Sequence, residues 1–368
     1  MIRVRVTVPG HTYDAIIERD LLARVGLHLR ELVSEARSVF VVTVRPVRRR
    51  WGRKLMASLA SAGFTAKILE MPDGEPHKKL RSVELLAERL AELGADRDSV
   101  LLAFGGGIVG DVTGLVASLY MRGVNLVQIP TTVLAQVDAS IGGKTGVNLK
   151  AGKNLVGTFH HPLAVLIDPE VLATLPDREF RAGLYESLKC GVIGNPELFA
   201  RLERADWKNL RRTPDTLESI ISESVKLKAK VVSADERESG LRRVLNFGHT
   251  IGHALETDSG YRRFLHGEAV AWGMIAAAEI AYETRTCSGE TSERIIQALL
   301  QFGPLPKVTA NSRNILRLLR SDKKTRNGVV HFVLPSSIGK VEVVDNVPEG
   351  VVLQAVDRLR ELSRPSKP

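Results

Sequence analysis

The first part of the chain alternates short apolar segments with segments of helical periodicity. Residues 2–8 alternate apolar and polar positions, which predicts a strand with one solvated face, and residues 13–18 predict its hairpin partner. Continuous apolar runs predict buried strands at 38–43, 65–69, 99–104, 124–129 and 164–168. Helical periods fall between them, at 21–32, 47–62, 82–93 and from residue 108 onward. Strands that alternate with helices indicate an α/β domain built on a parallel sheet.

Beyond residue 170 the apolar positions follow long helical periods. The predicted helices cover 178–192, 217–233, 244–257, 269–284, 293–301 and 314–319. A strand pair at 329–334 and 340–344 interrupts them, and a terminal helix follows near 348–362. We therefore expect a Rossmann-like α/β domain over residues 1–169 and a mainly α-helical domain over residues 170–368.

The composition is that of an ordinary globular protein with an excess of basic residues. Hydrophobic residues make up 44% of the 368 positions, which is enough for a core. No apolar run approaches the ~18–20 residues of a membrane span, and no signal peptide follows Met1. The two cysteines, Cys190 and Cys287, do not make a disulfide framework, so a cytoplasmic protein is expected.

The net charge of +10 is compatible with nucleic acid, a membrane surface or small anions as partners. Aromatic residues are only 5% of the chain and do not interleave with the arginine clusters at 45–53 and 313–320. A solvated basic face is therefore favoured over a nucleic-acid site. We expect no nucleic-acid partner and no membrane partner.

A glycine triplet, Gly105-Gly106-Gly107, lies between a predicted strand and a predicted helix. This arrangement presents backbone N–H groups to a phosphate, although a lone triplet is more often only a tight turn. Residues 105, 107 and 110 also fit the spacing G-x-G-x-x-G, without the acidic residue expected about 20 residues on. Gly143-Lys144-Thr145 imitates the end of a P-loop, but the glycine that such a loop needs is replaced by Asp138, so a P-loop is excluded.

Polar segments follow several predicted strands of the first half. Residues 73–78, 105–111 and 131–132 come directly after strands, and ligands bind parallel sheets at the carboxyl ends of the strands. We expect these segments to line one crevice. A loop beyond residue 132 is expected to add Asp138, Lys144, Lys153 and Asn154.

The helical half carries four polar clusters. Glu186 and Lys189 share one helix face at i, i+3, a spacing that a surface ion pair would also explain. His249 and His253 lie one helical turn apart, which suits a metal or an acid–base site, and His266 stands just ahead of another helix. The fourth cluster is a polar run with Lys228, Glu238, Arg242 and Asn246. A catalytic zinc takes three protein ligands, which one Glu and two His would supply; spacing alone favours His249 and His253 as a ligand pair.

The motifs taken together resemble the 3-dehydroquinate synthase family. They are GGGIVGDVTG, YMRG, IPTTVLAQVDASIGGKTGVN, GKNLVGTF, GLYESLKCGVIG, DERESGLRRVLNFGHTIGHALE and LHGEAVAWGM, and the resemblance covers nearly the whole chain. It implies conversion of 3-deoxy-D-arabino-heptulosonate 7-phosphate to 3-dehydroquinate and phosphate, in the shikimate pathway to aromatic amino acids. The implied steps are transient oxidation by bound NAD, phosphate elimination, re-reduction and aldol cyclisation. A divalent metal, zinc and possibly cobalt, and a homodimer are also implied.

The resemblance also implies site residues. Glu186, His249 and His266 resemble the metal ligands, and His253 instead resembles a substrate-facing proton-transfer residue. The residues that resemble substrate-phosphate donors are Lys144, Asn154, Lys189, one of Lys323 and Lys324, and Arg122 from a neighbouring subunit. Lys228, Arg242 and Asn246 resemble further substrate contacts of the family, and Glu238 and Asp138 resemble polar partners near the reacting hydroxyls. The NAD site is matched by Glu75, Lys78, Gly106, Gly107, Asp111, Thr131, Thr132 and Lys153, and we count Asp73 and Lys144 among the cofactor-binding candidates.

One position departs from the family pattern. The strand at 38–43 is usually followed by Asp or Asn, which can hydrogen-bond the adenosine ribose, whereas this chain has Val44 and Arg45. An arginine can accommodate a 2′-phosphate, so we expect weaker discrimination against NADP.

Three other functions are compatible with parts of the sequence. A related sugar phosphate cyclase would use the same motifs, but Lys228 and Arg242 favour an acidic substrate. A metal-dependent alcohol dehydrogenase would share the two-domain plan, and a basic nucleic-acid-binding protein would leave the polar clusters without a purpose. The favoured reading places one active site in a cleft between the nucleotide-binding half and the helical half.

Overall fold

The computed structural model describes residues 1–33, 38–321 and 330–364. Its packing divides the chain into two compact units. The first unit is Met1–Pro176 with Pro214–Ser233, and the second is Asp177–Thr213 with Ala234–Pro368. This division differs from the expected one chiefly at residues 214–233, which group with the first unit. The assignment of functions to residues 1–169 and 170–368 stays a prediction.

The first unit is built on a sheet with the strand order β1-β2-β9-β6-β5-β3-β4. The strands are β1 (Ile2–Val8), β2 (His11–Ile17), β3 (Val39–Val44), β4 (Ala66–Met71), β5 (Val100–Gly105), β6 (Asn125–Pro130) and β9 (Ala164–Ile167). The hairpin β1–β2 is antiparallel, and every other pair in this sheet is parallel. Strands β3, β5 and β9 are buried at every residue, as their continuous apolar runs predict.

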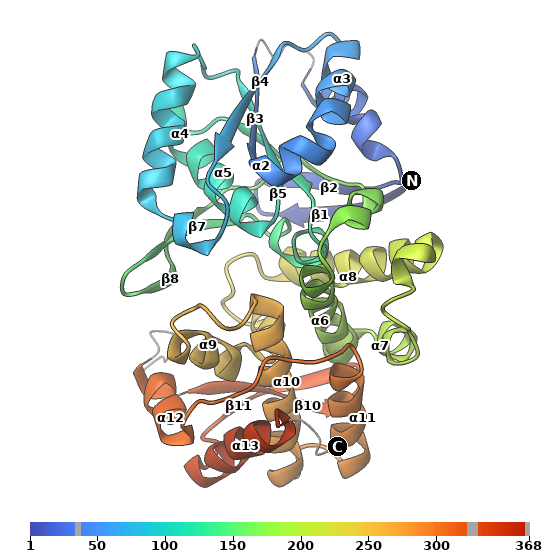
Figure 1. The fold of residues 1–368 in the computed structure, drawn as a ribbon, viewed down its shortest axis with the longest axis vertical. Coiled ribbons are helices and arrows are strands. Elements are labelled where there is room, and N and C mark those ends of the chain that lie inside the picture. The colour runs from blue at the N-terminus through green and yellow to red at the C-terminus, as the bar shows by residue number, and fades with distance from the viewer. Residues whose placement is uncertain (34–37, 322–329, 365–368) are drawn as a thin grey trace. The chain divides into compact units, whose positions relative to one another are not determined.

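Helices pack on the sheet of the first unit (Figure 1). Alternate residues of its strands belong to two separate hydrophobic clusters. These helices are α1 (Val25–Leu32), α2 (Arg45–Val47), α3 (Arg53–Ser61), α4 (Leu80–Glu92) and α5 (Gly107–Leu119). Helix α8 (Pro214–Ala234) also groups with this unit, up to residue 233. Phe40 and Val42 pack with residues of α4 and α5. Val39 and Val41 point to the other face and pack with residues of α1 and α3. The α/β class predicted from the sequence is confirmed.

A second small sheet corrects the expected loop beyond residue 132. The segment forms a π-helical turn at Ala135–Ala139 and then an antiparallel hairpin of β7 (Lys144–Leu149) and β8 (Gly152–Phe159). Lys144 begins β7, and Lys153 and Asn154 lie in β8. Gly146 and Gly157 face each other in the hairpin, where a Cβ on Gly157 would meet the Thr145 carbonyl oxygen at 2.0 Å. Because glycine is depleted in strands, these positions make the sequence resemble a loop.

The second unit is mainly helical, with α10 (His266–Glu283) at its centre. The other helices are α6 (Asp177–Gly194), α7 (Pro196–Glu203), α9 (His249–Asp258), α11 (Gly289–Leu300), α12 (Ser312–Ser321) and α13 (Glu349–Leu362). Strands β10 (His331–Ser337) and β11 (Lys340–Asp345) pair antiparallel, and the predicted strand start at residue 329 lies outside the described residues. α10 packs against α6, α9, α11 and α13 and is buried around most of its circumference (Figure 1).

Two details of the second unit differ from the sequence prediction. The helix expected at 244–257 is broken: a 3₁₀ segment, Leu241–Asn246, ends before α9 starts at His249. Gly248 causes the break because it adopts a left-handed conformation with φ 79°. Helix α7 was not predicted; Pro196 occupies its first turn, and the Asn195 side chain accepts a hydrogen bond from the Leu198 N–H.

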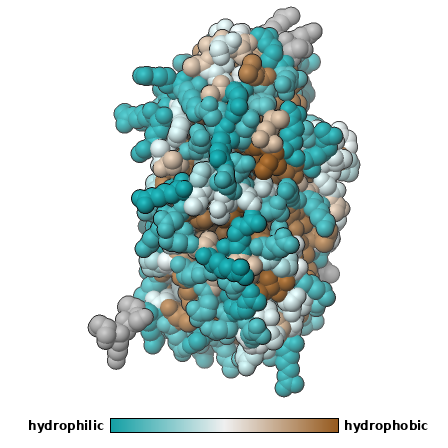
Figure 2. Space-filling view, turned by 90° about the vertical axis from the view of Figure 1, so that its right-hand side faces the viewer, coloured by the Kyte–Doolittle hydropathy of each residue, from teal (hydrophilic) through white to brown (hydrophobic). Residues whose placement is uncertain are grey.

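None of the helices within the described ranges is both long and apolar enough to cross a membrane. On the face shown in Figure 2, hydrophilic side chains cover most of the surface and hydrophobic ones form small patches.

Gly248 provides the first prediction. Gly248→Ala should lower the free energy of unfolding by about 1–2 kcal/mol for the left-handed backbone. A new Cβ would also meet Met274 Cγ at 2.5 Å and the Val270 carbonyl oxygen at 2.7 Å. This overlap should cost about 1–3 kcal/mol more.

The matched control is Gly260→Ala. Gly260 has φ +61°, and a Cβ there has no neighbour within 4 Å among the described residues. Denaturant unfolding of both variants separates the two effects: equal losses would mean that close packing at Gly248 contributes nothing.

Candidate active site

The glycine turn in the first unit leaves the start of α5 open to a ligand. β5 ends at Gly105, α5 begins at Gly107, and no described side chain caps the helix through a hydrogen bond to its first turn. A Cβ on Gly106 would lie 3.1 Å from Thr132 Cγ2, and one on Gly107 would lie 3.1 Å from Ala139 Cβ. The N–H of Thr131 donates to the Gly105 carbonyl at 2.9 Å, which brings Thr131 and Thr132 beside the turn. Bare N–H groups at a helix N-terminus suit the pyrophosphate of a dinucleotide.

A buried lysine joins three segments beside this turn. Nζ of Lys78 donates to Oδ2 of Asp111, on α5, at 2.5 Å and to Oδ1 of Asn154, on β8, at 2.5 Å. Lys78 is only 5% exposed. Burial raises the pKa of Asp111, and the Lys78 ammonium opposes that shift. The Lys78 ammonium therefore offsets part of the cost of placing the Asp111 carboxylate where it is poorly solvated.

Glu75, Asn148 and Lys153 extend the Lys78 network. Nδ2 of Asn148 donates to Oε1 of Glu75 at 2.7 Å, and Nζ of Lys153 lies 3.3 Å from the same oxygen. The backbone N–H of Asn154 donates to Oδ1 of Asn148 at 2.9 Å. Four predicted cofactor residues are thus brought together. Asn148 was missed by the sequence reasoning, although it lies inside the GKTGVN motif.

Lys228 connects α8 to the π-helical turn within the first unit. Its Nζ donates to the Asp138 carbonyl oxygen at 2.6 Å and to Oδ1 of Asp138 at 2.7 Å, and Lys228 is 6% exposed. Lys144 and Arg122 are exposed, and Arg122 has a left-handed φ of 67° in the turn after α5. Lys323 and Lys324 lie outside the described residues.

The second unit brings together one carboxylate and three imidazoles. Glu186 lies on α6, His249 and His253 on α9, and His266 is the first residue of α10. Oε1 of Glu186 is 3.9 Å from Nε2 of His249 and 3.8 Å from Nε2 of His266. The ring of His253 lies 5.3 Å from that of His249 and 5.9 Å from that of His266, between centroids.

These distances suit a divalent metal ion. Zinc forms bonds of about 2.0–2.2 Å to nitrogen and oxygen, so it can bridge ligand atoms up to about 4.3 Å apart. Neither oxygen of Glu186 accepts a hydrogen bond within the described part of the chain, although its side chain is only 1% exposed. Lys189 supplies one cation at Oε2, and Oε1 faces the two imidazoles. The three histidines form a second candidate set, whose ligand atoms lie within 4.8 Å of one another.

Lys189 forms an ion pair with Oε2 of Glu186, and its side chain is 2% exposed. The alternative of an ordinary surface pair is therefore wrong for this pair. A buried pair is expensive to desolvate and is weak support for stability, so a functional role is favoured.

Asp235 organises the segment that carries the fourth polar cluster. Its carboxylate accepts hydrogen bonds from the backbone N–H groups of Ser239, Gly240 and Arg242 at 2.9, 2.7 and 2.9 Å. Burial raises the pKa of Asp235, but these hydrogen bonds outweigh burial and hold it well below its usual range.

Within this segment the predicted residues pair with each other or with the backbone. Nδ2 of Asn246 donates to Oε1 of Glu238 at 2.5 Å, and the Arg242 guanidinium donates to the Glu236 carbonyl. The structure thus brings Glu238 and Asn246 together. Asp235 was missed because its role is to shape the backbone of the turn.

Comparisons with known proteins decide the family. Residues 68–182 match the family model described as 3-dehydroquinate synthase N-terminal, and residues 183–325 match 3-dehydroquinate synthase C-terminal. The chain belongs to the 3-dehydroquinate synthase family. A 3-dehydroquinate synthase of Koribacter versatilis (strain Ellin345) is 54% identical over 363 residues, 99% of each chain.

Two solved structures of named synthases share the fold of this chain. A 2-epi-5-epi-valiolone synthase from Streptomyces hygroscopicus, with NAD+ and Zn2+ bound, is 29% identical with a TM-score of 0.88, over 97% of this chain and 99% of that one. A 2-deoxy-scyllo-inosose synthase complexed with carbaglucose-6-phosphate, NAD+ and Co2+ is 26% identical with a TM-score of 0.87, over 97% and 100% of the two chains. The fold is therefore that of the dehydroquinate synthase-like cyclases.

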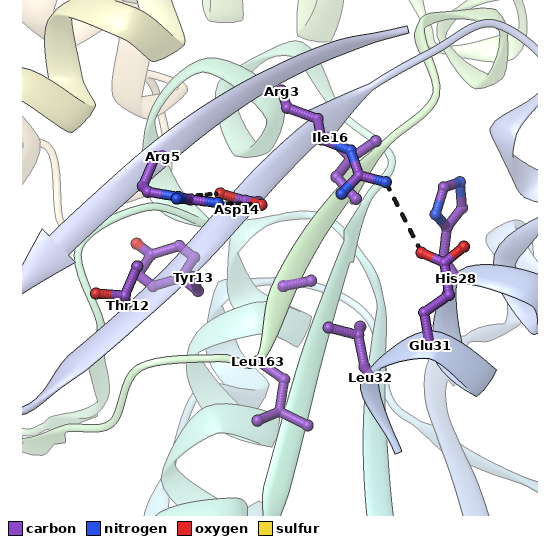
Figure 3. Close-up of a pocket in the computed structure, with 11 residues that line it drawn as sticks. Arg3, Arg5, Thr12, Tyr13, Asp14, Ile16, His28, Glu31, Leu32 and Leu163 are labelled. Carbon is purple, nitrogen blue, oxygen red and sulfur yellow. Dashed lines mark hydrogen bonds and ion pairs between the residues drawn. The ribbon is translucent and has the colours of Figure 1, made fainter. Parts of the chain in front are cut away.

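A pocket elsewhere in the first unit is not the family's site. It lies against β1, β2 and α1, and its charged side chains point toward one another (Figure 3). Arg5 pairs with Asp14 at 3.1 Å, and Arg3 pairs with Glu31 at 3.7 Å. The pocket is lined neither by the glycine turn nor by the Lys78 network, so it does not provide the features that a dinucleotide needs.

The Lys78–Asp111 pair generates a stability prediction with a defined pH dependence. Lys78→Met leaves Asp111, whose side chain is 22% exposed, without its ammonium, so stability should be lost near neutral pH, by less than the about 3–5 kcal/mol of a fully buried pair. The pKa of Asp111 then lies further above its unfolded value. At low pH the variant is destabilised less, because Asp111 is protonated and carries no charge. As pH rises through the folded-state pKa, Asp111 ionises and the variant loses stability. The gap in unfolding temperature between parent and variant should therefore widen from about pH 4 to pH 8.

The double variant Lys78→Met/Asp111→Asn is the control, because it removes the titrating group. Its gap to the parent should not follow the pH dependence of the single variant. A gap for Lys78→Met that stays constant or narrows with rising pH would contradict the assignment.

Proposed function

We propose that this protein is a 3-dehydroquinate synthase, which converts 3-deoxy-D-arabino-heptulosonate 7-phosphate to 3-dehydroquinate and phosphate in the shikimate pathway. The single observation that carries the proposal is the 54% identity to a 3-dehydroquinate synthase over 99% of both chains. The dinucleotide turn and the carboxylate–histidine cluster support it, because the reaction uses NAD and a divalent metal, zinc or cobalt.

When bound, NAD supplies a reversible hydride acceptor and the metal ion stabilises negative charge on substrate oxygens. The residues proposed to hold NAD lie in the first unit: the glycine turn takes the pyrophosphate, and the Lys78 network braces it. Gly106, Gly107, Thr131 and Thr132 are the proposed turn contacts, joined by Asp73, Glu75, Lys78, Asp111, Lys144 and Lys153.

Glu186, His249 and His266 are the proposed metal ligands. The geometry also allows His253 in place of Glu186. Glu186 is preferred because its Oε1 lies within 4 Å of Nε2 of both His249 and His266, while Lys189 pairs with its other oxygen. The Nδ1 atoms of the two ligands have other contacts: His249 Nδ1 lies 3.1 Å from the Phe247 carbonyl oxygen, and His266 Nδ1 lies 3.4 Å from Glu256 Oε2. Both Nε2 atoms therefore remain to face Glu186.

His253 is the proposed proton-transfer residue. It lies on the same face of α9 as His249, one turn away, so its ring is adjacent to the proposed metal site without being required as a ligand. An imidazole titrates near neutral pH, which suits it to accept a proton from a substrate carbon and to return one.

Cationic and amide side chains are proposed to bind the phosphate and the carboxylate of the substrate. They are Lys144, Asn154, Lys189, Lys228, Arg242, Asn246, one of Lys323 and Lys324, and Arg122 of a neighbouring subunit in a homodimer. Asp138 and Glu238 are the proposed polar partners of the reacting hydroxyls. A cytoplasmic location is part of the same proposal.

The test is product identification with the holoenzyme. Heptulosonate phosphate, NAD+ and zinc should give 3-dehydroquinate and one phosphate per turnover, with no net NADH. Release of phosphate from a heptulose phosphate or a glucose phosphate, but not from the heptulosonate phosphate, would identify a related cyclase instead. Steady accumulation of NADH would identify an alcohol dehydrogenase.

The roles of the histidines give the next prediction. His266→Ala should abolish stoichiometric zinc retention, because a ligand is lost. His253→Ala should retain the zinc and slow turnover by roughly 10²–10⁴-fold, the range for a missing general acid–base. Metal analysis after gel filtration and steady-state kinetics measure the two effects. Zinc loss in His253→Ala with full retention in Glu186→Gln would favour the three-histidine set.

The cofactor preference gives a further prediction. Val44 ends β3 and is 5% exposed in the core, so it cannot hydrogen-bond a ribose, whereas Arg45 is exposed. Thr43 pairs with Phe104 in the sheet, which places the following residues beside Gly105 and Gly106. We expect the parent to bind NADP within about tenfold of NAD, and Arg45→Ala to weaken NADP binding alone. Fluorescence titration of the stripped enzyme measures both; a strong parental preference for NAD would refute the idea.

A further inference from the structure

Glu256 is a buried carboxylate next to the proposed metal site that belongs to neither candidate ligand set. It lies on α9 at i+7 from His249 and i+3 from His253, so the three side chains share one face of the helix. Its side chain is 2% exposed. Its Oε2 lies 3.4 Å from Nδ1 of His266, on the neighbouring helix α10.

The two ring nitrogens of His266 therefore face two different carboxylates. Nε2 lies 3.8 Å from Oε1 of Glu186, and Nδ1 faces Glu256. The side chain of His266 is 30% exposed, which is much more than either glutamate. A partly exposed ring at the start of a helix can adopt several rotamers. A hydrogen bond at Nδ1 therefore restricts the direction in which Nε2 points.

His249 has a neutral anchor at the corresponding atom. Its Nδ1 lies 3.1 Å from the backbone carbonyl oxygen of Phe247. Other contacts hold the start of α10 in place. The Glu268 carboxylate accepts a hydrogen bond from the Leu265 N–H at 2.8 Å and forms an ion pair with Arg178 at 2.7 Å. Glu268 thus fixes the helix end, and Glu256 is placed to fix the ring.

We propose that Glu256 is a positioning residue for His266, accepting the Nδ1–H of the neutral imidazole so that the Nε2 lone pair is presented as a ligand. This inference rests on the proposed metal site. A carboxylate behind a metal-binding imidazole fixes its tautomer, orients the ring and increases its basicity, and removal of such a partner costs 10–100-fold in metal affinity.

Cobalt binding to the full-length protein tests this role without measuring turnover. Protein stripped with a chelator is titrated with Co2+ alone, and the visible absorption of bound cobalt gives affinity and coordination. Glu256→Ala should weaken cobalt binding roughly 10–100-fold. Glu256→Gln should weaken it less, because an amide oxygen still accepts the Nδ1–H but carries no charge. Unfolding temperatures in chelator should match the parent for Glu256→Gln.

Glu279→Gln is the matched control. Glu279 is a glutamate on α10, its side chain is 19% exposed, and it pairs with Arg358 at 3.5 Å. This variant should bind cobalt like the parent. His266→Ala is the second reference, and it should bind little or no cobalt.

The outcomes separate the two levels of the proposal. Parental cobalt affinity and spectrum in both Glu256 variants, with binding lost in His266→Ala, would overturn the role of Glu256 and leave the metal site standing. Parental affinity in His266→Ala would overturn the metal site itself. If Glu256→Gln binds cobalt more weakly and also unfolds at a lower temperature than the parent in chelator, Glu256 has a general structural role. That outcome would also overturn the inference.

Discussion

The close approach of three helix backbones in the second unit is the constraint on which its polar cluster depends. A Cβ on Gly267, at the start of α10, would meet the Ala182 carbonyl oxygen of α6 at 1.8 Å. A Cβ on Gly273 would meet the Gly248 carbonyl oxygen, just before α9, at 1.8 Å. No residue other than glycine fits at these contacts. Because α6, α9 and α10 touch through bare backbone, side chains from all three converge on one point.

Convergence at that distance changes the chemistry of the side chains. Glu186 would be an unfavourable core residue on its own, since a carboxylate with 1% exposure loses its hydration. With two imidazole Nε2 atoms within 4 Å of one oxygen and a buried ammonium at the other, the same position becomes a candidate for binding a metal ion. The first unit also pairs buried ammonium groups with carboxylates, Lys78 with Asp111 and Lys228 with Asp138. Buried charge in both units is thus concentrated where ligands are proposed to bind, as expected for sites that trade stability for function.

The fold alone does not select among related reactions. The two solved cyclases share it at TM-scores of 0.88 and 0.87, and their names give products other than 3-dehydroquinate. What distinguishes a substrate is the set of polar groups at the site. The proposed substrate contacts include the buried cations Lys228 in the first unit and Lys189 and Arg242 in the second, each held by a carboxylate or a carbonyl group. A doubly anionic sugar acid phosphate is the kind of substrate that such groups can bind.

Sequence and tertiary structure contributed different parts of this picture. Periodicity was enough to locate most strands and helices, because continuous apolar runs and helical periods follow directly from burial on one or two faces. It failed where glycine weakened the signal, in the β7–β8 hairpin and at the break before α9. The motif order was enough to identify the family, since several long motifs in sequence rarely coincide by chance.

The sequence by itself determined the fold class, the family and the residue types available for chemistry. Only the tertiary structure decided which of these residues meet. Spacing along α9 made His249 and His253 an obvious pair, yet Glu186 and His266, far away in sequence, lie as close to His249 as a shared ion requires. Asn148, Asp235 and Glu256 lie within the family motifs, but spacing along the chain assigns no role to any of them. Their roles arise from distances between separate segments, and those distances are set by packing rather than by local pattern.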